Sequence, residues 1–424
     1  MLQAFKSVVS LLLGAGALIL GNGLIGIVLP VRMSLAHVPP GIVGLVMSSY
    51  YAGLVGGCLW GRGIILRVGH IRAFAAFAAI VAATTLVYPL WIDRPFWALL
   101  RAIGGFCMAG LFATIESWLN LRSSSETRGK ILSIYMVTSY LASTIGQLLV
   151  NVWDVRGLEL FCLGDMLLCL SLVPVVLTHV SGPDMGHVVP LSFPKLYRIS
   201  PLGVVSACGS GLVSGALYGL GAAFGAGIGM SIFTISILMG ITTMGGLLIQ
   251  WPIGYLSDKY DRRTVLLWVL VAIATICLAE YAMSRSPWAR VSLLVLNGFL
   301  GGGVATLYPL SVAHAFDYVE RDQMVAASSG MLLSWAIGAT AGPLIASQAM
   351  AAGGGWALYL YMAAVAGALA AFARYRMGRR MALAPEAQSK YAPVGEATVT
   401  AGTLDPRAAG APGQAHLDPV EAAL

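Results

Sequence analysis

Long apolar runs separated by short charged stretches repeat along most of the chain. Most runs have about 20 residues or more, the length that an α-helix needs to cross the apolar core of a bilayer. A helix also satisfies its own backbone hydrogen bonds, so such runs can lie in lipid. The pattern therefore predicts an all-α polytopic membrane protein. Twelve spanning helices are expected, at residues 7–30, 41–61, 71–92, 96–119, 130–152, 158–179, 203–227, 231–255, 264–283, 289–312, 325–350 and 356–377.

The longest internal polar stretch lies between the sixth and seventh predicted helices and divides them into two sets of six. The two sets resemble each other, since Glu126-Thr127-Arg128 follows the fourth helix and Glu320-Arg321-Asp322 follows the tenth. Internal duplication of this kind is typical of alternating-access transporters. We therefore expect two pseudo-symmetric six-helix bundles. Their predicted limits are residues 1–179 and 203–377, joined by a cytoplasmic connector at 180–202 and followed by a disordered cytoplasmic tail at 378–424.

The composition agrees with a membrane protein. Charged residues make up 10% of the chain and hydrophobic residues 58%, whereas a soluble domain carries about 25% charged residues. The net charge of +7 comes from basic residues in short loops, which indicates membrane topology rather than binding to nucleic acid. These residues concentrate on the side of the N-terminus, so both termini are expected in the cytoplasm. Nothing in the cysteine spacing indicates a metal site, and no cofactor is expected.

One charged loop carries the most informative motif. Gly254-Tyr255-Leu256-Ser257-Asp258-Lys259-Tyr260-Asp261-Arg262-Arg263 lies between the eighth and ninth predicted helices. It resembles the loop between the second and third helices of each half in major facilitator superfamily transporters. The corresponding loop of the first half, Gly61 to Arg72, keeps the arginines and Gly69 but has Leu66 where the family carries Asp. The subgroup that the chain most resembles is a bacterial one described as YcaD-like.

Two further elements are similar to the family. Arg101-Ala102-Ile103-Gly104-Gly105 in the fourth helix matches its Arg-x-x-x-Gly run. Gly338-Ala339-Thr340-Ala341-Gly342-Pro343 looks like an antiporter element, but it lies in the eleventh helix instead of the fifth. It therefore gives no evidence for drug–proton antiport. The resemblance implies a monomeric secondary transporter of the bacterial inner membrane.

Two charged residues inside the apolar runs are candidates for proton coupling. Arg101 lies about 10 Å below the outer surface, where a charge costs several kcal/mol unless it faces water or a partner. Asp165 lies at a similar depth in the sixth helix, so the two could form a pair. The resemblance implies a coupling role for Arg101. Purely structural roles stay open for both residues.

An inner gate is expected at the cytoplasmic ends of the helices. The resemblance implies that Glu116 meets Arg67 or Arg72 when the transporter faces outward. Asp258 and Arg262, with Arg263 beside them, are expected to act in the same way against the inner end of the eleventh helix.

Large polar and aromatic side chains in the helices expected to line the cavity are candidates for substrate contact. Polar groups in hydrocarbon need partners, so they should face the protein interior. Contact with substrate and bonding to a neighbouring helix are both open. The candidates are Asn22, Tyr140, Tyr218, Asn297, Tyr308 and Trp335.

These features predict a secondary active transporter for a small, mostly neutral or amphipathic solute. We expect alternating access, coupling to protons and export, with uptake and a non-transporting sensor as alternatives. An enzyme would need a polar cluster at one membrane face, for which His314 and Asp317 are the best pair but have no third partner. No nucleotide-binding loop is present in the sequence, so transport driven by ATP is not expected.

Overall fold

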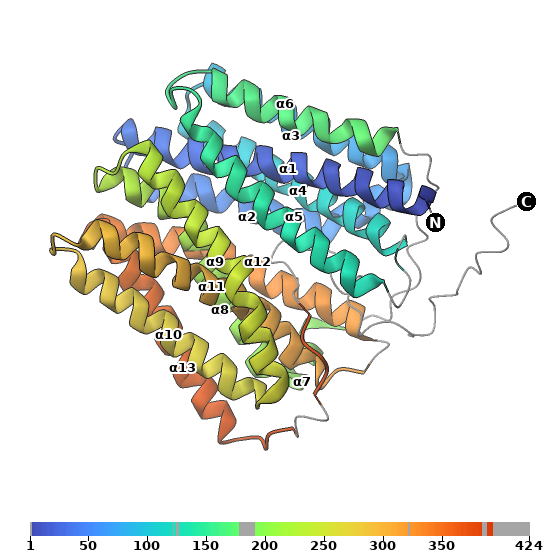
Figure 1. Cartoon of the computed structure of the whole chain (residues 1–424), viewed down its shortest axis with the longest axis vertical. Helices are drawn as coiled ribbons and strands as arrows, with labels where there is room; N and C mark the ends of the chain where they lie inside the picture. The colour runs from blue at the N-terminus through green and yellow to red at the C-terminus, as the bar shows by residue number, and fades with distance from the viewer. Residues whose placement is uncertain are drawn as a thin grey trace, which may run out of the picture.

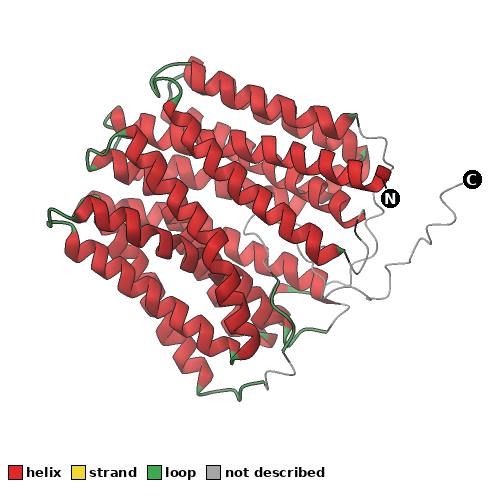
Figure 2. Cartoon of the chain, viewed as in Figure 1, coloured by secondary structure: helices red, strands yellow, loops and turns green. Residues whose placement is uncertain are grey.

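The computed structural model describes residues 2–121, 123, 127–177, 191–320, 323–383 and 388–392, with side chains from Val8 onward. Most of the predicted connector and tail, residues 178–190, 384–387 and 393–424, lies outside the described residues, so the predicted tail disorder is untested there. The described part of the chain is helical and contains no strand (Figure 2). The predicted all-α class is therefore confirmed.

The first half folds into six long helices that pack side by side (Figure 1). Their bounds are α1 Leu2–Leu35, α2 Pro40–Val68, α3 His70–Leu90, α4 Arg94–Leu121, α5 Arg128–Leu148 and α6 Glu159–Val176, with the short 3-10 turn η1 Leu149–Asn151 after α5. A short helix, α7 Phe193–Ile199, precedes the second half. The second half contains α8 Pro201–Gly227, α9 Ile232–Lys259, α10 Arg262–Met283, α11 Ala289–Phe316, α12 Met324–Gly353 and α13 Ala357–Met377.

Twelve of these helices are long and apolar enough to cross a membrane, as predicted. The sequence prediction also places each of them correctly along the chain, although α1, α2, α9, α11 and α12 extend three or more residues beyond a predicted limit. The short helix α7 was not predicted, because its seven residues lie within the polar connector.

Glycines set the closest helix contacts in the same way in both halves. At Gly53 of α2 a Cβ atom would overlap the carbonyl oxygen of Ala102 on α4. At Gly245 of α9 a Cβ atom would overlap the carbonyl oxygen of Gly298 on α11. Small residues allow backbones to approach this closely in membrane bundles. Because α2 and α4 hold the same places in the first half as α9 and α11 in the second, the shared device supports pseudo-symmetry.

The two bundles meet through α2 with α12, α5 with α9, and α1 with α8. We call the end where α2 and α9 finish, at Val68 and Lys259, the N-terminal face, and the other end the opposite face. In Figure 1 the bundles lie together at the opposite face and diverge toward the N-terminal face. Hydrogen bonds across the closed part include Ser48 Oγ to Thr340 O, Gln147 Nε2 to Thr243 Oγ1 at 3.1 Å, and Asn151 Nδ2 to Ser236 Oγ at 2.8 Å.

Candidate functional site at the interface of the two bundles

Arg101 lies buried inside the first bundle, with 7% of its surface exposed. Its guanidinium carbon lies 4.7 Å from the centroid of the Tyr50 ring, and Nη2 lies 3.8 Å from the Met47 sulfur. Its Nε has no hydrogen-bond partner among the described residues. A cation over an aromatic face is stabilised by about 2 kcal/mol when desolvated. The aromatic ring therefore offsets part of the cost of burying this charge.

Aromatic side chains continue from Arg101 across the interface between the bundles. Tyr50 contacts Tyr51, with 5.5 Å between ring centroids, and both belong to α2. Tyr51 contacts Trp335 of α12 at 6.0 Å, and Trp335 contacts Tyr308 of α11 at 6.2 Å. We call Tyr50, Tyr51, Trp335 and Tyr308 the interface aromatic cluster. The cluster links Arg101 in the first bundle with helices of the second.

Polar groups flank this cluster on both bundles. Asn22 of α1 lines a cavity of about 20 Å³ with Tyr50 and Arg101, which is room for one water molecule. Trp335 Nε1 donates to Ser214 Oγ at 3.1 Å, so its indole is held from the side of α8. The aromatic cluster thus crosses the junction of the bundles, and the buried cation lies next to it within the first bundle.

The other predicted cavity residues lie at different places in the structure. Tyr140 of α5 donates to Gln250 Oε1 of α9 at 3.5 Å and so crosses the interface. Tyr218 is half-buried on α8 and packs against the larger apolar core. For Asn297 the structure shows the second of the two alternatives, bonding to a neighbouring helix. Its side chain bonds Tyr359 of α13 at 3.0 Å, inside the second bundle.

The predicted pair of Arg101 and Asp165 is not formed. Helix α6 turns Gly164 and Leu168 toward α1, and Leu168 lines the same cavity as Arg101. Asp165 lies beside this buried stripe, is partly exposed, and has Cys169 Sγ 3.9 Å from its carboxylate. The sequence places both residues at a similar depth in the membrane. The orientation of α6 about its axis nevertheless keeps Asp165 away from Arg101.

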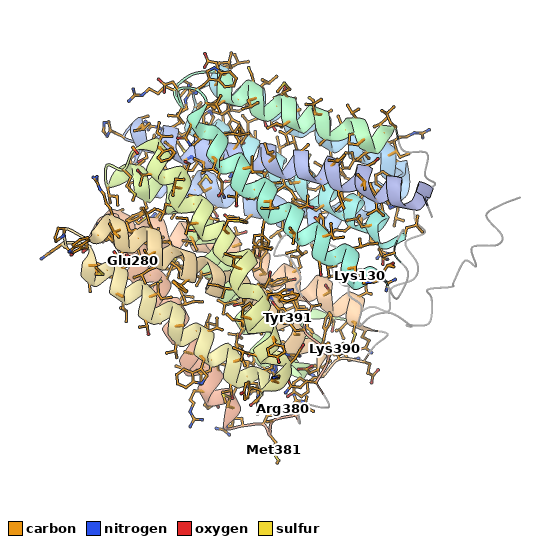
Figure 3. The ribbon with its side chains drawn as sticks, viewed as in Figure 1. Lys130, Glu280, Arg380, Met381, Lys390 and Tyr391 are labelled. Carbon is orange, nitrogen blue, oxygen red and sulfur yellow. The ribbon has the colours of Figure 1, made fainter. Side chains whose placement is uncertain are left out.

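A buried carboxylate that the sequence analysis did not select lies in the second bundle. Glu280, near the end of α10, is fully buried and accepts a hydrogen bond from Ser292 Oγ at 3.1 Å. Its second oxygen has no hydrogen-bond partner within the described part of the chain. Figure 3 shows Glu280 at the opposite face. The only sign of this buried carboxylate in the sequence is a single Glu near the end of the ninth apolar run.

The inner-gate residues of the first half lie apart in this structure. Glu116 is fully buried and accepts from the Tyr135 hydroxyl at 3.4 Å. Arg67 and Arg72 are exposed, and no ion pair joins either to Glu116 among the described residues. The prediction concerned a state closed at the N-terminal face. Because the bundles diverge there, it stays a prediction.

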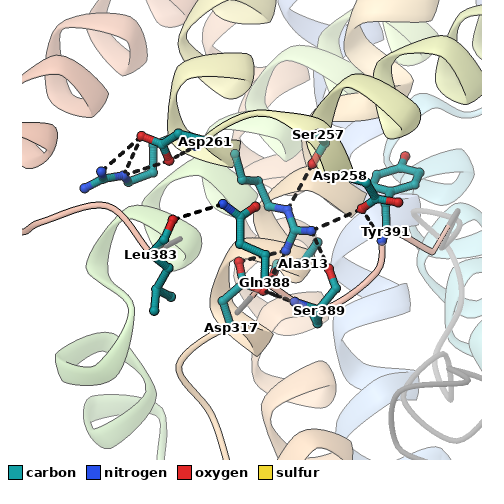
Figure 4. A network of polar contacts seen from close by, with 11 residues as sticks. Ser257, Asp258, Asp261, Ala313, Asp317, Leu383, Gln388, Ser389 and Tyr391 are labelled. Atoms are coloured by element: carbon teal, nitrogen blue, oxygen red, sulfur yellow. Dashed lines mark hydrogen bonds and ion pairs between the residues drawn. The ribbon is translucent and has the colours of Figure 1, made fainter. Parts of the chain in front are cut away.

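The inner-gate residues of the second half form a compact network (Figure 4). Arg262 is the largest fully buried side chain among the described residues. Its Nη1 donates to both carboxylate oxygens of Asp317 at 2.7 Å, and its Nε donates to Ser257 Oγ at 2.9 Å. Asp258 lies 3.5 Å from Nη2. In this structure the partner of Arg262 is therefore the end of α11. The expected contact with α12, the eleventh spanning helix, concerns a state closed at the N-terminal face and stays a prediction.

Other charged and aromatic residues near this network have partners of their own. Arg263 pairs with Asp261 at 3.0 Å and donates to the Arg380 carbonyl at 2.7 Å. Asp317, the acid of the pair considered for an enzyme, is occupied by Arg262, and His314 stacks against Tyr318 at 5.3 Å. No group of three potential metal ligands occurs in the described residues. Arg262, Asp258 and Asp317 therefore form an ion-pair network at the N-terminal face of the second bundle.

Comparison with known proteins identifies the family. The sequence model of the Major Facilitator Superfamily matches residues 11–198 and again 199–408. The MFS-type transporter YcaD of Salmonella typhimurium is 30% identical over 347 residues, covering 81% of this chain and 89% of that protein.

Solved structures show a similar fold. The nucleoside transporter NupG superposes with a TM-score of 0.73 at 16% identity, covering 88% of this chain and 99% of that one. A bacterial homologue of the human lysosomal transporter Spinster, in an inward-facing occupied conformation, gives a TM-score of 0.64 at 16% identity, covering 90% and 97%. The human organic anion transporter TETRAN gives 0.59 at 15% identity, covering 87% and 99%. The double match and the curated relatives show that this multi-pass membrane protein belongs to the Major Facilitator Superfamily, a family of transporters rather than enzymes.

Proposed function

We propose that the chain is a secondary active transporter that moves a small, mostly neutral or amphipathic solute by alternating access. The observation that carries the proposal is the interface aromatic cluster, which crosses the junction of the two bundles and packs on Arg101 within the first bundle. The bundles touch at the opposite face and diverge at the other. In this fold the substrate site lies near the midplane between the repeats, and the bundles rock about it. A solute bound at the junction would be exposed to one face at a time.

The chemistry of the junction favours an amphipathic solute with a flat apolar part. Tyr51 and Trp335 bring aromatic rings from both bundles into edge-to-face contact, a geometry that aromatic pairs prefer. Arg101 can accept one anionic group, because its guanidinium already lies against Tyr50 and no carboxylate among the described residues pairs with it. The nucleoside transporter and the organic anion transporter share only the fold at this identity. The substrate class therefore rests on the residues of this chain.

Proton coupling is proposed to involve Arg101 and a carboxylate in the spanning helices. Asp165 keeps its place as a candidate, although it does not reach Arg101. Glu280 is the second candidate, because it is buried with one oxygen without a hydrogen-bond partner in the described part of the chain. Burial disfavours the charged form of a carboxyl group, so it favours binding of a proton. The proton would be released when a change between states exposes the group to water.

Orientation follows from the loop charges. With both termini in the cytoplasm of a bacterial cell, the chain spans the inner membrane and this structure is open toward the cytoplasm. Export is proposed, with uptake as the alternative direction. We expect the monomer to be sufficient for transport, because each chain supplies both bundles of the junction.

The experiment that tests this function is solute-evoked proton release by purified protein in weakly buffered detergent. A panel of neutral metabolites, aromatic solutes and organic anions is compared in the wild type, Arg101→Ala, Glu280→Gln and Asp165→Asn. One solute class that evokes release in the wild type, and not in Arg101→Ala, is the expected result. Solute binding without proton release would remove proton coupling. Release unaffected by all three substitutions would remove these residues from the coupling path.

A further inference from the structure

The described tail segment, residues 388–392, does not extend into solvent. It lies in an extended conformation against the gate network of the second bundle (Figure 4). Figure 3 shows Lys390 and Tyr391 between Lys130 at the start of α5 and Arg380 after α13, in the region where the bundles diverge. We call residues 388–392 the C-terminal strap.

The strap binds the gate through its backbone. The Ser389 N–H donates to Asp317 Oδ1 at 2.9 Å and its hydroxyl donates to the same oxygen at 2.8 Å. The Ser389 carbonyl accepts from Arg262 Nη2 at 2.5 Å. The Tyr391 N–H donates to Asp258 Oδ1 at 2.7 Å. Hydrogen bonds to ionised groups are the strongest that a peptide can form, so these four contacts define a docking site for an extended peptide.

Apolar contacts continue the docking from the gate into the space between the bundles. The Tyr391 ring packs on Gly254 of α9, where a Cβ atom would overlap it. Ala392 is 3% exposed and belongs to the same apolar cluster as Leu54 of α2 and Ala109 of α4, in the first bundle. The strap therefore runs from the gate of the second bundle into an apolar cluster that contains residues of both bundles.

The start of the tail is fixed separately. Arg380 donates to the Ile199 carbonyl at 2.9 Å and lies 3.7 Å from the centroid of the Tyr318 ring. Its own carbonyl accepts from Arg263. An anchor at Arg380 keeps the strap close to its site, which raises the effective concentration of the strap there.

We propose that the C-terminal strap docks on Asp258, Arg262 and Asp317 and holds the bundles apart at the N-terminal face. The docked strap occupies Asp258, a predicted gate residue, and buries Ala392 in the apolar cluster that contains residues of both bundles. Release of the strap permits closure. The effect of the strap on transport rests on the proposed function, alternating access. The docking itself rests only on the contacts of Ser389 and Tyr391 with the gate.

The test compares the full chain with a chain truncated after Leu383, which keeps the Arg380 anchor. Both carry spin labels at Leu121→Cys on α4 and Tyr375→Cys on α13, in a background without the six native cysteines. The full chain should give one long distance across the N-terminal face. The truncated chain should gain a second, shorter population. A peptide of residues 386–394 should restore the long distance, and a peptide of scrambled sequence should not.

Point variants test the same contacts in the full chain. Ser389→Pro removes the N–H and the hydroxyl that bind Asp317, and it should give the short population as truncation does. Met381→Ser changes a residue that is 90% exposed outside the strap and should leave the distances unchanged. Identical distance distributions in the full, truncated and Ser389→Pro chains would overturn the proposal. Transport by the same chains in liposomes is measured in parallel: transport with unchanged distances refutes the strap alone, whereas a distance change without transport of any solute refutes the proposed function alone.

Discussion

The guanidinium of Arg101 on α4 lies over the ring of Tyr50 on α2 at 4.7 Å. This contact joins the buried charge of the first bundle to the interface aromatic cluster, which ends on α11 and α12 of the second. A change at the junction of the bundles can therefore reach Arg101 through packed rings. The two features that the sequence suggested, a buried cation and aromatic side chains, are adjacent in the structure.

Replacing Tyr50 should weaken this site in a way that depends on the ring. Tyr50→Leu removes the aromatic face below Arg101 and should lower the free energy of unfolding by about 2 kcal/mol. Tyr50→Phe keeps the face and should cost less than about 1 kcal/mol, the value of one hydrogen bond. Thermal unfolding in detergent measures both. Equal losses in the two variants would show that the ring does not stabilise the cation.

The close approach of α2 and α4 predicts a strict requirement for glycine. Gly53→Ala would push a methyl group into the Ala102 carbonyl, and overpacking of this kind costs about 1–3 kcal/mol. Gly63→Ala on the same helix meets no atom within 4 Å and is the matched control. It should be neutral or gain up to about 1 kcal/mol from helix propensity. Similar melting temperatures for the two variants would contradict the observed packing.

The buried ion pair between Arg262 and Asp317 predicts a strong non-additivity. Arg262→Leu leaves an unpaired buried carboxylate and should cost about 3–5 kcal/mol, as should Asp317→Leu. The double variant removes both charges and should cost less than the sum of the two single changes. Melting temperatures of the four chains form a double-mutant cycle. Additive losses would mean that the two side chains do not depend on each other.

Glu280 gives a prediction that separates stability from transport. Glu280→Gln has the same shape and removes a buried charge, so thermal stability should be unchanged or raised. Proton release should fall at least about tenfold if this carboxylate carries the proton. Ser292→Ala removes only its hydrogen-bond donor and should retain release. Normal release by Glu280→Gln would leave Glu280 with a structural role.

The sequence predicted the parts of the fold that depend on composition and order along the chain. Twelve apolar runs gave twelve spans, and the loop from Gly254 to Arg263 identified the family. Rotation of a helix about its axis was not predictable from one sequence with weak polarity. For this reason a pair of Asp165 with Arg101 stayed possible, and substrate contact and bonding to a neighbouring helix both stayed open for Asn297 until the structure showed its bond to Tyr359.

Contacts between distant segments were also beyond the sequence. Ser389 and Asp317 are 72 positions apart, and nothing in an Ala-, Pro- and Gly-rich tail indicates that its backbone binds a gate carboxylate. Tyr50 and Tyr51 were not selected as cavity residues, because only the contact with Trp335 reveals that they reach the second bundle. The sequence thus identifies the buried charge, and the structure identifies its surroundings.

The central claim is that two bundles rock about a shared site, and locking the opposite face tests it most directly. Gln147 and Thr243 bond each other across this face at 3.1 Å, so Gln147→Cys and Thr243→Cys in a chain without native cysteines can be joined by a short reducible cross-linker. The measurement is the movement of the solute identified in the panel across liposome membranes. The account predicts that cross-linking stops transport and that reduction restores it. A solute that crosses equally fast in the cross-linked chain would contradict alternating access.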